Sequence, residues 1–387
     1  MKKQKVLIFI SNYLPGYKIG GPLNSVRSII ENLKSHFDFS IITSDRDLGD
    51  LYPYKNISTN KWSKFEGANI IYWKTNFRYY INVIKFLRKN KFDSIYVNSL
   101  FDFKFSIFLV LIVYLRIVKI NQLIVAPRGE LFTNALAFGY RKKILFLKIA
   151  KLFNFYNKIV WHSTAQIENE TIENIFNTTN IRLSRVISNT DNVELNIGNI
   201  DFETKSENFL KTIFLSRISK EKNLPYALNV LKKVVIPVEF HIYGPIEDEK
   251  IWEECMIIIQ KMPKNIAVIY KGSIENKYVK SYFSKYDIFL FPTRLENFGH
   301  VISESLSVGT PVLISNNTPW LNLQKKKLGW DFDLNMENDF IKVLNSYLDK
   351  TSEYKTKLRK EVIQAYANSL NKKSIIKENI DLFKYEK

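Results

Sequence analysis

Residues 288–315 read IFLFPTRLENFGHVISESLSVGTPVLIS and contain the pattern that decides the fold. An apolar run is followed by a polar loop with Gly299, a helix-period stretch that starts near His300, and a second apolar run. Apolar runs of this length, separated by a helix, are typical of strands buried on both faces of a parallel sheet. The stretch therefore predicts a strand–loop–helix–strand unit whose loop lies at the carboxyl end of a strand, where such sheets form ligand sites.

The same alternation continues along most of the chain. Runs rich in Val, Ile and Phe predict strands at 5–11, 39–44, 69–73, 94–98, 122–126, 158–163, 185–188, 211–216, 239–243, 266–270, 288–292 and 311–315. Helical spacing fills the gaps, and the first helix is expected behind Asn24 or Ser25 as its N-cap, with an apolar face that ends at Phe37. Strands that alternate with helices predict α/β domains with parallel sheets.

The polar stretch 192–208 is weakly patterned and is typical of a linker between domains. With a boundary near Phe202, we expect an N-terminal Rossmann-like domain at 1–201 and a C-terminal Rossmann-like domain at 202–370. Both have the usual size of α/β domains. A final helix within 371–387 is expected to cross back and pack on the first domain.

The composition fits a folded protein, because 46% of the 387 residues are hydrophobic and 14% are aromatic. These values exclude disordered and collagen-like classes. The single cysteine, Cys255, excludes an internal disulfide and a cysteine zinc site, and it indicates a reducing compartment. The first apolar run is too short for a secretion signal, so we expect a cytoplasmic protein.

The chain carries 57 Lys and Arg against 38 Asp and Glu, a net charge of +19, which favours anionic partners. The sequence has neither zinc-finger spacing nor an RNA-binding signature, so we expect no nucleic-acid partner. The nine apolar residues 107–115 are too few to span a bilayer and predict a helix that covers a sheet. The alternative is peripheral contact with an anionic inner membrane, favoured by nearby cations: Lys104, Arg116, Lys119, Arg141, Lys142 and Lys143.

Two carboxylates, Glu296 and Glu304, lie eight residues apart, one on the loop and one on the following helix. The start of that helix presents N–H groups and a positive dipole end, which suit a phosphate. Carboxylates beside a phosphate need hydroxyl donors, which sugars and ribose supply. The alternative interpretation is a helix cap for Glu296 and a solvated helix residue for Glu304.

Arg217 and Lys222 follow the predicted strand at 211–216. Two cations there can bind a diphosphate and neutralise the charge on a leaving group, whereas a solvated basic loop is the alternative. Gly20 and Gly21, after the first strand, allow close backbone approach. Neither GxGxxG nor GxxxxGK[ST] occurs in the sequence, which argues against a nicotinamide site and the usual P-loop enzymes.

In combination, these motifs resemble the retaining glycosyltransferases of family 4, within glycosyl transferases group 1, which have the GT-B fold of two Rossmann-like domains facing across a cleft. The matching features, in chain order, are the segments 126–131 and 162–164, the pair Arg217 and Lys222, the segment 242–245, and the pair Glu296 and Glu304. The likeness covers nearly the whole chain.

The resemblance implies a role for each matching residue. Arg217 and Lys222 would hold the diphosphate of the donor, Glu304 its ribose hydroxyls and Glu296 the hydroxyls of the transferred sugar. The other donor-side residues that it implies are Gly20, Gly21, Asn297, Phe298, Gly299, His300 and Val301. On the acceptor side it implies Arg128 and His162, with a purely structural histidine as the alternative for His162.

The implied reaction moves a sugar from a UDP-, GDP- or other nucleotide-diphosphate sugar to a hydroxyl of a growing glycan or polyprenyl-linked acceptor. Such enzymes build bacterial surface polysaccharides, capsule or lipopolysaccharide, at the inner face of the plasma membrane. Retention would proceed without a protein nucleophile, the acceptor attacking from the face that the leaving diphosphate vacates. No cofactor and no metal are expected, because the nearest metal-like motif, Asp45-Arg46-Asp47, lies off the predicted site.

One segment departs from the pattern of the family. Residues 188–192, SNTDN, replace a Pro-Asn-Gly turn at the end of the first domain, which alters the backbone near the expected hinge. Two other functions stay open: a non-catalytic nucleotide-sugar- or polysaccharide-binding protein, and a GT-B epimerase or phosphorylase. The complete set of two cations and two carboxylates favours the transferase.

Overall fold

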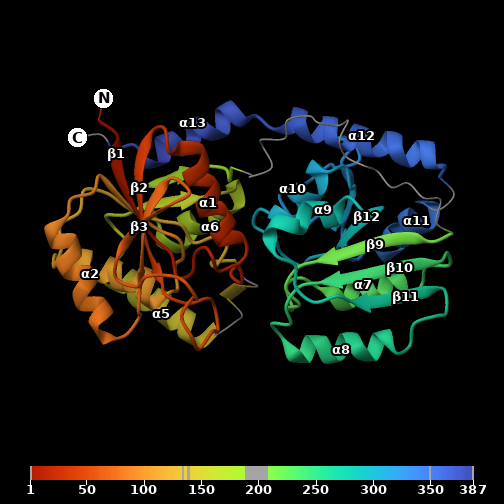
Figure 1. Cartoon of the computed structure of the whole chain (residues 1–387), viewed down its shortest axis with the longest axis horizontal. Coiled ribbons are helices and arrows are strands. Elements are labelled where there is room, and N and C mark those ends of the chain that lie inside the picture. Colours follow the sequence, from red (N-terminus) through yellow and green to blue (C-terminus); the bar gives the residue numbers. More distant parts are fainter. Residues whose placement is uncertain (1, 133–134, 137–139, 188–207, 348–349, 386–387) are drawn as a thin grey trace. The chain divides into compact units, whose positions relative to one another are not determined.

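The computed structural model describes residues 2–132, 135–136, 140–187, 208–347 and 350–385. It divides into two units: residues 1–189 with 372–387 (unit 1), and residues 190–371 (unit 2). The C-terminal segment of the chain thus belongs to the unit that holds the N-terminus (Figure 1).

Unit 1 contains an eight-stranded sheet in the order β3-β4-β2-β1-β5-β6-β7-β8, parallel except for β3. Its strands are β1 (Gln4–Phe9), β2 (Phe37–Ser44), β3 (Trp62–Phe65), β4 (Ala68–Trp73), β5 (Ser94–Val97), β6 (Leu123–Val125), β7 (Val160–Ser163) and β8 (Ile181–Leu183). Its helices are α1 (Gly21–Leu33), α2 (Phe77–Lys89), α3 (Phe108–Tyr114) behind a π-helical turn (Phe103–Ile107), α5 (Tyr140–Leu152), α6 (Gln166–Phe176) and α13 (Lys372–Phe383).

Both faces of this sheet are buried. Along β1, Val6 and Ile8 enter one core with residues of α1 and α13, whereas Leu7 and Phe9 enter the other core with residues of α2 and α3. Side chains alternate between the faces of a strand, so a strand with helices on both sides must be apolar throughout. This arrangement explains why the strand runs of the sequence are continuous.

Unit 2 contains a six-stranded parallel sheet in the order β11-β10-β9-β12-β13-β14. Its strands are β9 (Leu210–Leu215), β10 (Val238–Tyr243), β11 (Ile266–Tyr270), β12 (Ile288–Phe291), β13 (Val312–Ser315) and β14 (Gly329–Phe332). Its helices are α7 (Leu224–Leu231), α8 (Glu249–Ile259), α9 (Val279–Phe283) behind a 3₁₀ turn (Asn276–Tyr278), α10 (His300–Ser307), α11 (Glu337–Tyr347) and α12 (Ser352–Ser369).

The strands predicted from the sequence are confirmed to within a few residues at their ends, except at 185–188. The strand there is β8 (Ile181–Leu183), and residues 185–187 have no regular structure; residue 188 lies outside the described residues. The short, half-exposed β8 forms no continuous apolar run, so its pattern is weak. Two further edge strands were missed for the same reason: β3 is fully exposed, and every residue of β14 is half-buried.

The start of α1 also differs from the prediction. The helix begins at Gly21 with Gly20 as its N-cap, four to five residues before the expected cap, and Phe37 opens β2 instead of closing the helix. Pro22 in the first turn explains the early start, because its missing N–H costs nothing there.

The apolar segment at 107–115 forms α3, and Leu109, Val110 and Ile112 are buried in the core of unit 1, as expected for a helix that covers a sheet. Among the described residues, no helix is both long and apolar enough to cross a bilayer. The predicted linker at 192–208, except its last residue, lies outside the described part of the chain. So do the boundary near Phe202 and the altered turn at 188–192.

The two last helices belong to different units. α12 packs against α10 of unit 2, and α13 packs against α1 and β8 of unit 1. The ring of Phe383 lies edge-on to those of Phe37, Phe39 and Tyr96. The predicted return of the C-terminal helix to the first unit is therefore confirmed.

Candidate active site

The sheet of unit 2 reverses its winding between β9 and β12. The chain proceeds from β9 outward to β10 and β11, then returns to pair β12 against the other side of β9. Loops that leave the carboxyl ends of two such strands diverge and open a crevice. Arg217 and Lys222 follow β9, and Glu296 follows β12, so all three lie at this reversal point.

Hydrogen bonds join the two loops. The Asn223 side chain donates from Nδ2 to the Pro292 carbonyl (2.9 Å) and accepts at Oδ1 from Arg294 Nε (3.0 Å). Thr293 Oγ1 donates to the Glu221 carbonyl (2.9 Å). Asn223 has a positive φ of 59°, a conformation that asparagine tolerates better than most residues. The loop after β9 is therefore held against the loop after β12.

This junction brings Lys222 and Glu296 together. Lys222 Nζ lies 2.8 Å from Glu296 Oε2, and only 13% and 16% of the two side chains is exposed. Burial alone would raise the pKa of Glu296, but the charge and hydrogen bond of Lys222, with the backbone N–H of Asn297, outweigh it and leave the pKa below its usual value. The site thus holds a largely buried ammonium and an ionised carboxylate side by side.

Arg217 is more open. Its Nη1 lies 2.7 Å from both carboxylate oxygens of Glu247, which follows β10, and 40% and 44% of the two side chains is exposed. Exposed ion pairs contribute little stability. A diphosphate can therefore replace Glu247 as the partner of Arg217 at small cost.

Gly299 shapes the start of α10. It is the N-cap with a positive φ of 78°, and a Cβ there would lie 2.8 Å from Ile302 Cδ1 and 3.1 Å from Glu296 Cγ. A side chain would therefore push on the site carboxylate. The absence of a side-chain cap leaves the positive end of the α10 dipole, at His300 and Val301, facing the Glu296 loop.

Trp320 was not predicted as a site residue. Its Nε1 donates to the Phe298 carbonyl (2.5 Å), and the Phe298 ring packs 4.8 Å from the His300 ring. Glu296 N–H donates to the Asn317 carbonyl (3.1 Å), close to Trp320 in the chain. Through these two hydrogen bonds, the loop after β13 holds the segment from Glu296 to Phe298 in place.

Glu304 lies on α10 and is half-buried. Burial raises the pKa of its carboxyl to about 8, and the charge of Lys280 offsets this only in part. Near neutral pH the carboxyl is therefore mostly protonated. Hydroxyl donors that stabilise the ionised form would draw the pKa back down.

The sheet of unit 1 has its own reversal point between β1 and β5. Gly20 and Gly21 follow β1, and Asn98, at the end of β5, donates from Nδ2 to the Pro22 carbonyl (3.2 Å). Gly20 has a φ of 62°, and a Cβ built on it meets nothing within 4 Å. The glycine turn therefore borders open space at the same edge of this sheet.

Arg128 and His162 belong to one hydrogen-bond network, in which Arg128 is half-buried and His162 is buried. Arg128 donates to Asn98 Oδ1 (2.8 Å) and to the Tyr96 hydroxyl (2.6 Å), and Tyr96 lies 2.9 Å from His162 Nδ1. His162 Nε2 lies 2.9 Å from the Ser184 carbonyl. Burial, together with the charge of Arg128, lowers the pKa of His162 to about 3, so the ring is neutral, donates from Nε2 and accepts at Nδ1.

The predicted residues thus divide between the two units. In unit 2 the structure brings together Lys222 and Glu296, with Arg217 on the same loop, whereas His162 in unit 1 is 1% exposed and lies behind Tyr96. Sequence reasoning missed Asn223, Arg294, Trp320, Asn98 and Tyr96. A polar residue at the end of a predicted strand run, as Asn98 is in 94–98, was the signal that could have found one of them.

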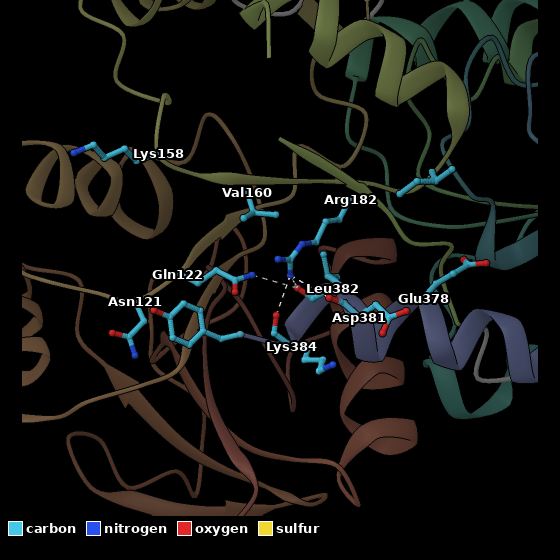
Figure 2. A pocket seen from close by; sticks show the side chains of 11 residues that line it. Asn121, Gln122, Lys158, Val160, Arg182, Glu378, Asp381, Leu382 and Lys384 are labelled. Carbon is cyan, nitrogen blue, oxygen red and sulfur yellow. Dashed lines mark hydrogen bonds between the residues drawn. The ribbon is translucent and has the colours of Figure 1, made fainter. Parts of the chain in front are cut away.

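A pocket of about 660 Å³ opens elsewhere in unit 1, near the amino ends of β6 and β7. Figure 2 shows Arg182 pointing to the end of α13, where its Nη1 donates to the carbonyls of Asp381 (3.0 Å), Leu382 (2.7 Å) and Lys384 (3.2 Å). None of the predicted site residues lines it. The pocket belongs to the docking of α13.

Within the described ranges, no three His, Cys, Asp or Glu side chains group together as a metal site would require. Asp45 and Asp47, the metal-like pair of the sequence, have other partners. Asp47 accepts the backbone N–H groups of Tyr17 and Lys18 (2.8 and 3.2 Å), and Asp45 pairs with Arg46 (2.9 Å).

A family model matches the second part of the chain. Residues 197–367 match the family described as "Glycosyl transferases group 1". A relative from Klebsiella pneumoniae, described as an "Uncharacterized 41.2 kDa protein in cps region", is 24% identical over 312 residues, which cover 77% of this chain and 78% of that protein.

Solved structures match over the whole length. Anabaena Alr3699/HepE in complex with UDP-glucose has a TM-score of 0.68 at 12% identity, with 98% of each chain covered. The sucrose-phosphate synthase of Thermosynechococcus elongatus has a TM-score of 0.69 at 14% identity, covering 97% of this chain and 96% of that one. WaaG, a glycosyltransferase involved in lipopolysaccharide biosynthesis, has a TM-score of 0.63 at 13% identity, covering 98% and 100%. These matches confirm the GT-B fold.

Proposed function

We propose that this chain, which has the GT-B fold and whose residues 197–367 match the glycosyl transferases group 1 family, transfers a sugar, with retention, from a nucleotide-diphosphate sugar to a hydroxyl of a bacterial surface glycan. The observation that carries the proposal is the largely buried pair of Lys222 and Glu296 at the reversal point of the unit 2 sheet. Membership of family 4 is part of the proposal.

In this mechanism the two cations act on the leaving group. The diphosphate binds between Arg217 and Lys222, so Arg217 exchanges its exposed partner Glu247 for phosphate oxygens. As the anomeric carbon–oxygen bond breaks, negative charge grows on the diphosphate, and the fixed cations stabilise it. Because these two cations can balance the charge of the diphosphate, we propose a reaction that needs neither a metal nor a cofactor.

The carboxylates act on hydroxyls. Glu296, ionised beside Lys222, accepts from the hydroxyls of the transferred sugar and orients its ring. Glu304 accepts from the ribose hydroxyls, and the backbone at 297–301 holds the sugar and phosphate. The acceptor hydroxyl attacks from the face that the diphosphate leaves and passes its proton to a phosphate oxygen, so both steps occur on one face.

Arg128 is proposed for the acceptor side. Gly20 and Gly21 are proposed to lie near the diphosphate of the donor. His162 is proposed as a positioning residue, since it reaches Arg128 through Tyr96 and contacts no solvent. The acceptor class is a glycan or a polyprenyl-linked glycan of capsule or lipopolysaccharide, which places the enzyme in the cytoplasm at the inner face of the membrane. The relative from a cps region supports this class.

Ligand-observed NMR of the full chain against UDP-, GDP-, ADP- and dTDP-sugars tests the proposal. We expect one nucleotide to bind, Arg217→Ala and Lys222→Ala to abolish that binding, and Lys250→Ala, an exposed cation on α8, to leave it unchanged. Binding that survives both site substitutions would refute the site. If the donor binds but is neither slowly hydrolysed nor transferred to any glycan, the result would favour a non-catalytic role.

A further inference from the structure

Helix α5 (Tyr140–Leu152) has an unusual exposed face. Leu145, Ile149 and Leu152 are 59%, 38% and 78% exposed, and they lie at spacings of four and three residues. Such spacing places the three side chains in one stripe along the helix. The opposite face is the one that packs on unit 1, because Leu147 and Ala150 are buried in its core.

Cations flank this stripe. At about 100° per residue, Arg141, Lys142 and Lys148 lie within about 60° of Leu145 around the helix axis, and all three are exposed. The helix contains no Asp or Glu. Between residues 103 and 167 the chain has ten Lys and Arg and a single acidic residue, Glu130, whose carboxylate accepts from Ser99 and the backbone of Leu100.

The apolar surface continues past the end of α5. Phe153 is 54% exposed, and its ring stacks at 5.8 Å on that of Phe155. Phe155 in turn packs 5.0 Å from Tyr114 at the end of α3, beside Leu115, which is 61% exposed. Arg116 and Lys119 follow directly. Exposed apolar groups in one contiguous patch mark an interaction site.

We propose that this surface, the exposed face of α5 with Phe153, Tyr114 and Leu115, binds an anionic phospholipid bilayer, with α5 (yellow in Figure 1) lying in the plane of the interface. Aliphatic side chains enter the boundary between headgroups and acyl chains, and the flanking cations bind lipid phosphates. Nucleic acid is a poorer fit, because it would place the aliphatic stripe against charged phosphates. The inference rests on the proposed function in one respect: a lipid-linked acceptor is the reason why the enzyme would work at a membrane.

The surface differs from the one that the sequence suggested. The apolar segment of α3 is turned into the core, and only its last residues reach the patch. The membrane contact is instead assigned to a neighbouring helix with alternating apolar and basic residues. Such a helix lies on a membrane and does not cross it.

Vesicle co-sedimentation tests the inference. The full chain is mixed with vesicles of phosphatidylcholine alone and with vesicles that contain 30% phosphatidylglycerol, at two salt concentrations. We expect binding to the anionic vesicles alone, weakened by salt. Lys142→Gln with Lys148→Gln should lower the partition coefficient about 25-fold, since each cation near an anionic surface contributes about fivefold.

The apolar stripe has its own variant, Leu145→Ser with Leu152→Ser, which should lower the partition coefficient about tenfold or more. The control variant, Lys250→Gln with Ile257→Ser, removes a comparable exposed pair from α8 of unit 2 and should bind like the wild type. Circular dichroism checks that each variant is folded.

Three results would overturn the inference: equal binding to both vesicle types, equal loss in the α5 and α8 variants, or a wild-type dimer that the Leu145→Ser, Leu152→Ser variant makes monomeric. The last would assign the face to a second copy of the chain. Binding of the soluble nucleotide sugar needs no membrane. Its measurement on the same variants therefore separates a failure of this inference from a failure of the donor site.

Discussion

Two residues of the candidate site hold opposite protonation states although both carry carboxyl groups. Glu296 lies beside Lys222, which keeps its pKa below the usual value, whereas Glu304 has no comparable neighbour and its burial raises the pKa to about 8. Environments that separate two carboxyl groups in this way are typical of groups with different tasks. In the proposed mechanism, Glu296 is ready to accept hydrogen bonds from hydroxyls, and Glu304 becomes ready when the donor binds.

This difference predicts a pH dependence of donor binding. Because the pKa of Glu304 is raised, its carboxyl is protonated below about pH 8, and in the proposed site it must lose that proton for both oxygens to accept from the ribose hydroxyls. Donor affinity should rise up to about tenfold per unit between pH 6 and 8 and level off above. Isothermal titration calorimetry in buffers of different ionisation enthalpy measures both the affinity and the proton released.

The matched control is Glu304→Gln, which keeps the shape of the side chain and removes its titration. It should bind the donor more weakly and without this pH dependence. A wild-type affinity that stays constant from pH 6 to 9 would show that Glu304 does not contact the donor.

The strand-end positions of the candidate site residues were predictable from the sequence, whereas their hydrogen-bond partners were not. Strand ends and residue spacing can be read from short stretches of sequence. They are the basis on which we chose Arg217, Lys222, Glu296 and Glu304. The Asn223 side chain that bridges to Pro292 and Arg294 joins positions about 70 residues apart, and no local pattern encodes such a contact. The burial of His162 behind Tyr96 could not be predicted from the sequence for the same reason.

At the scale of elements, the loop after β9 depends on a glycine of the neighbouring strand. Gly244, directly after β10, has a φ of 139°, and a Cβ there would lie 1.9 Å from the Ser216 carbonyl oxygen. The clash is with backbone, which cannot move aside as a flexible side chain can. Gly244 therefore fixes how closely the β10 end approaches the loop that carries Arg217.

Gly244→Ala should destabilise the protein by about 1–3 kcal/mol and weaken donor binding, because the Ser216–Arg217 backbone must shift. Gly272→Ala is the control: its φ of 75° is also left-handed, but a Cβ there meets nothing within 4 Å. Urea unfolding measures both variants. Equal destabilisation would mean that the left-handed backbone, and not the close approach, accounts for the cost.

Central elements were easier to predict than edges. β1, β9 and β12 are buried on both faces, so their sequences are continuous apolar runs with little ambiguity. β3, β8 and β14 lie at sheet edges, where exposed positions tolerate polar residues and the pattern fades. The winding reversal that forms the site depends on strand order, which only the resemblance to known enzymes implied.

At the scale of the molecule, α13 holds the end of the chain on unit 1 through Arg182. Arg182→Ala removes three hydrogen bonds to the last carbonyls of the helix, where a cation also interacts favourably with the dipole. We expect a loss of about 1.5–3 kcal/mol in the local stability of α13. Hydrogen exchange of the peptide 372–385, followed by mass spectrometry, measures this loss.

Arg185→Ala provides the comparison. Its pair with Glu378 also ties α13 to unit 1, but 47% of the Arg185 side chain is exposed, and such surface pairs contribute less than about 1 kcal/mol. Arg182→Ala should therefore accelerate exchange more than Arg185→Ala. The reverse order would show that the exposed pair, and not the capping arginine, holds the helix.

The return of α13 also has a topological consequence. The Gln4 side chain exchanges hydrogen bonds with the backbone of Tyr385, so the two ends of the chain meet on one unit. Unit 2 is then a contiguous insert, residues 190–371, within a discontinuous host. A circular permutant that joins residue 387 to residue 1 by a short linker and opens between 189 and 190 would carry unit 2 first and unit 1 as one unbroken segment, so that each could be exchanged between relatives with a single crossover.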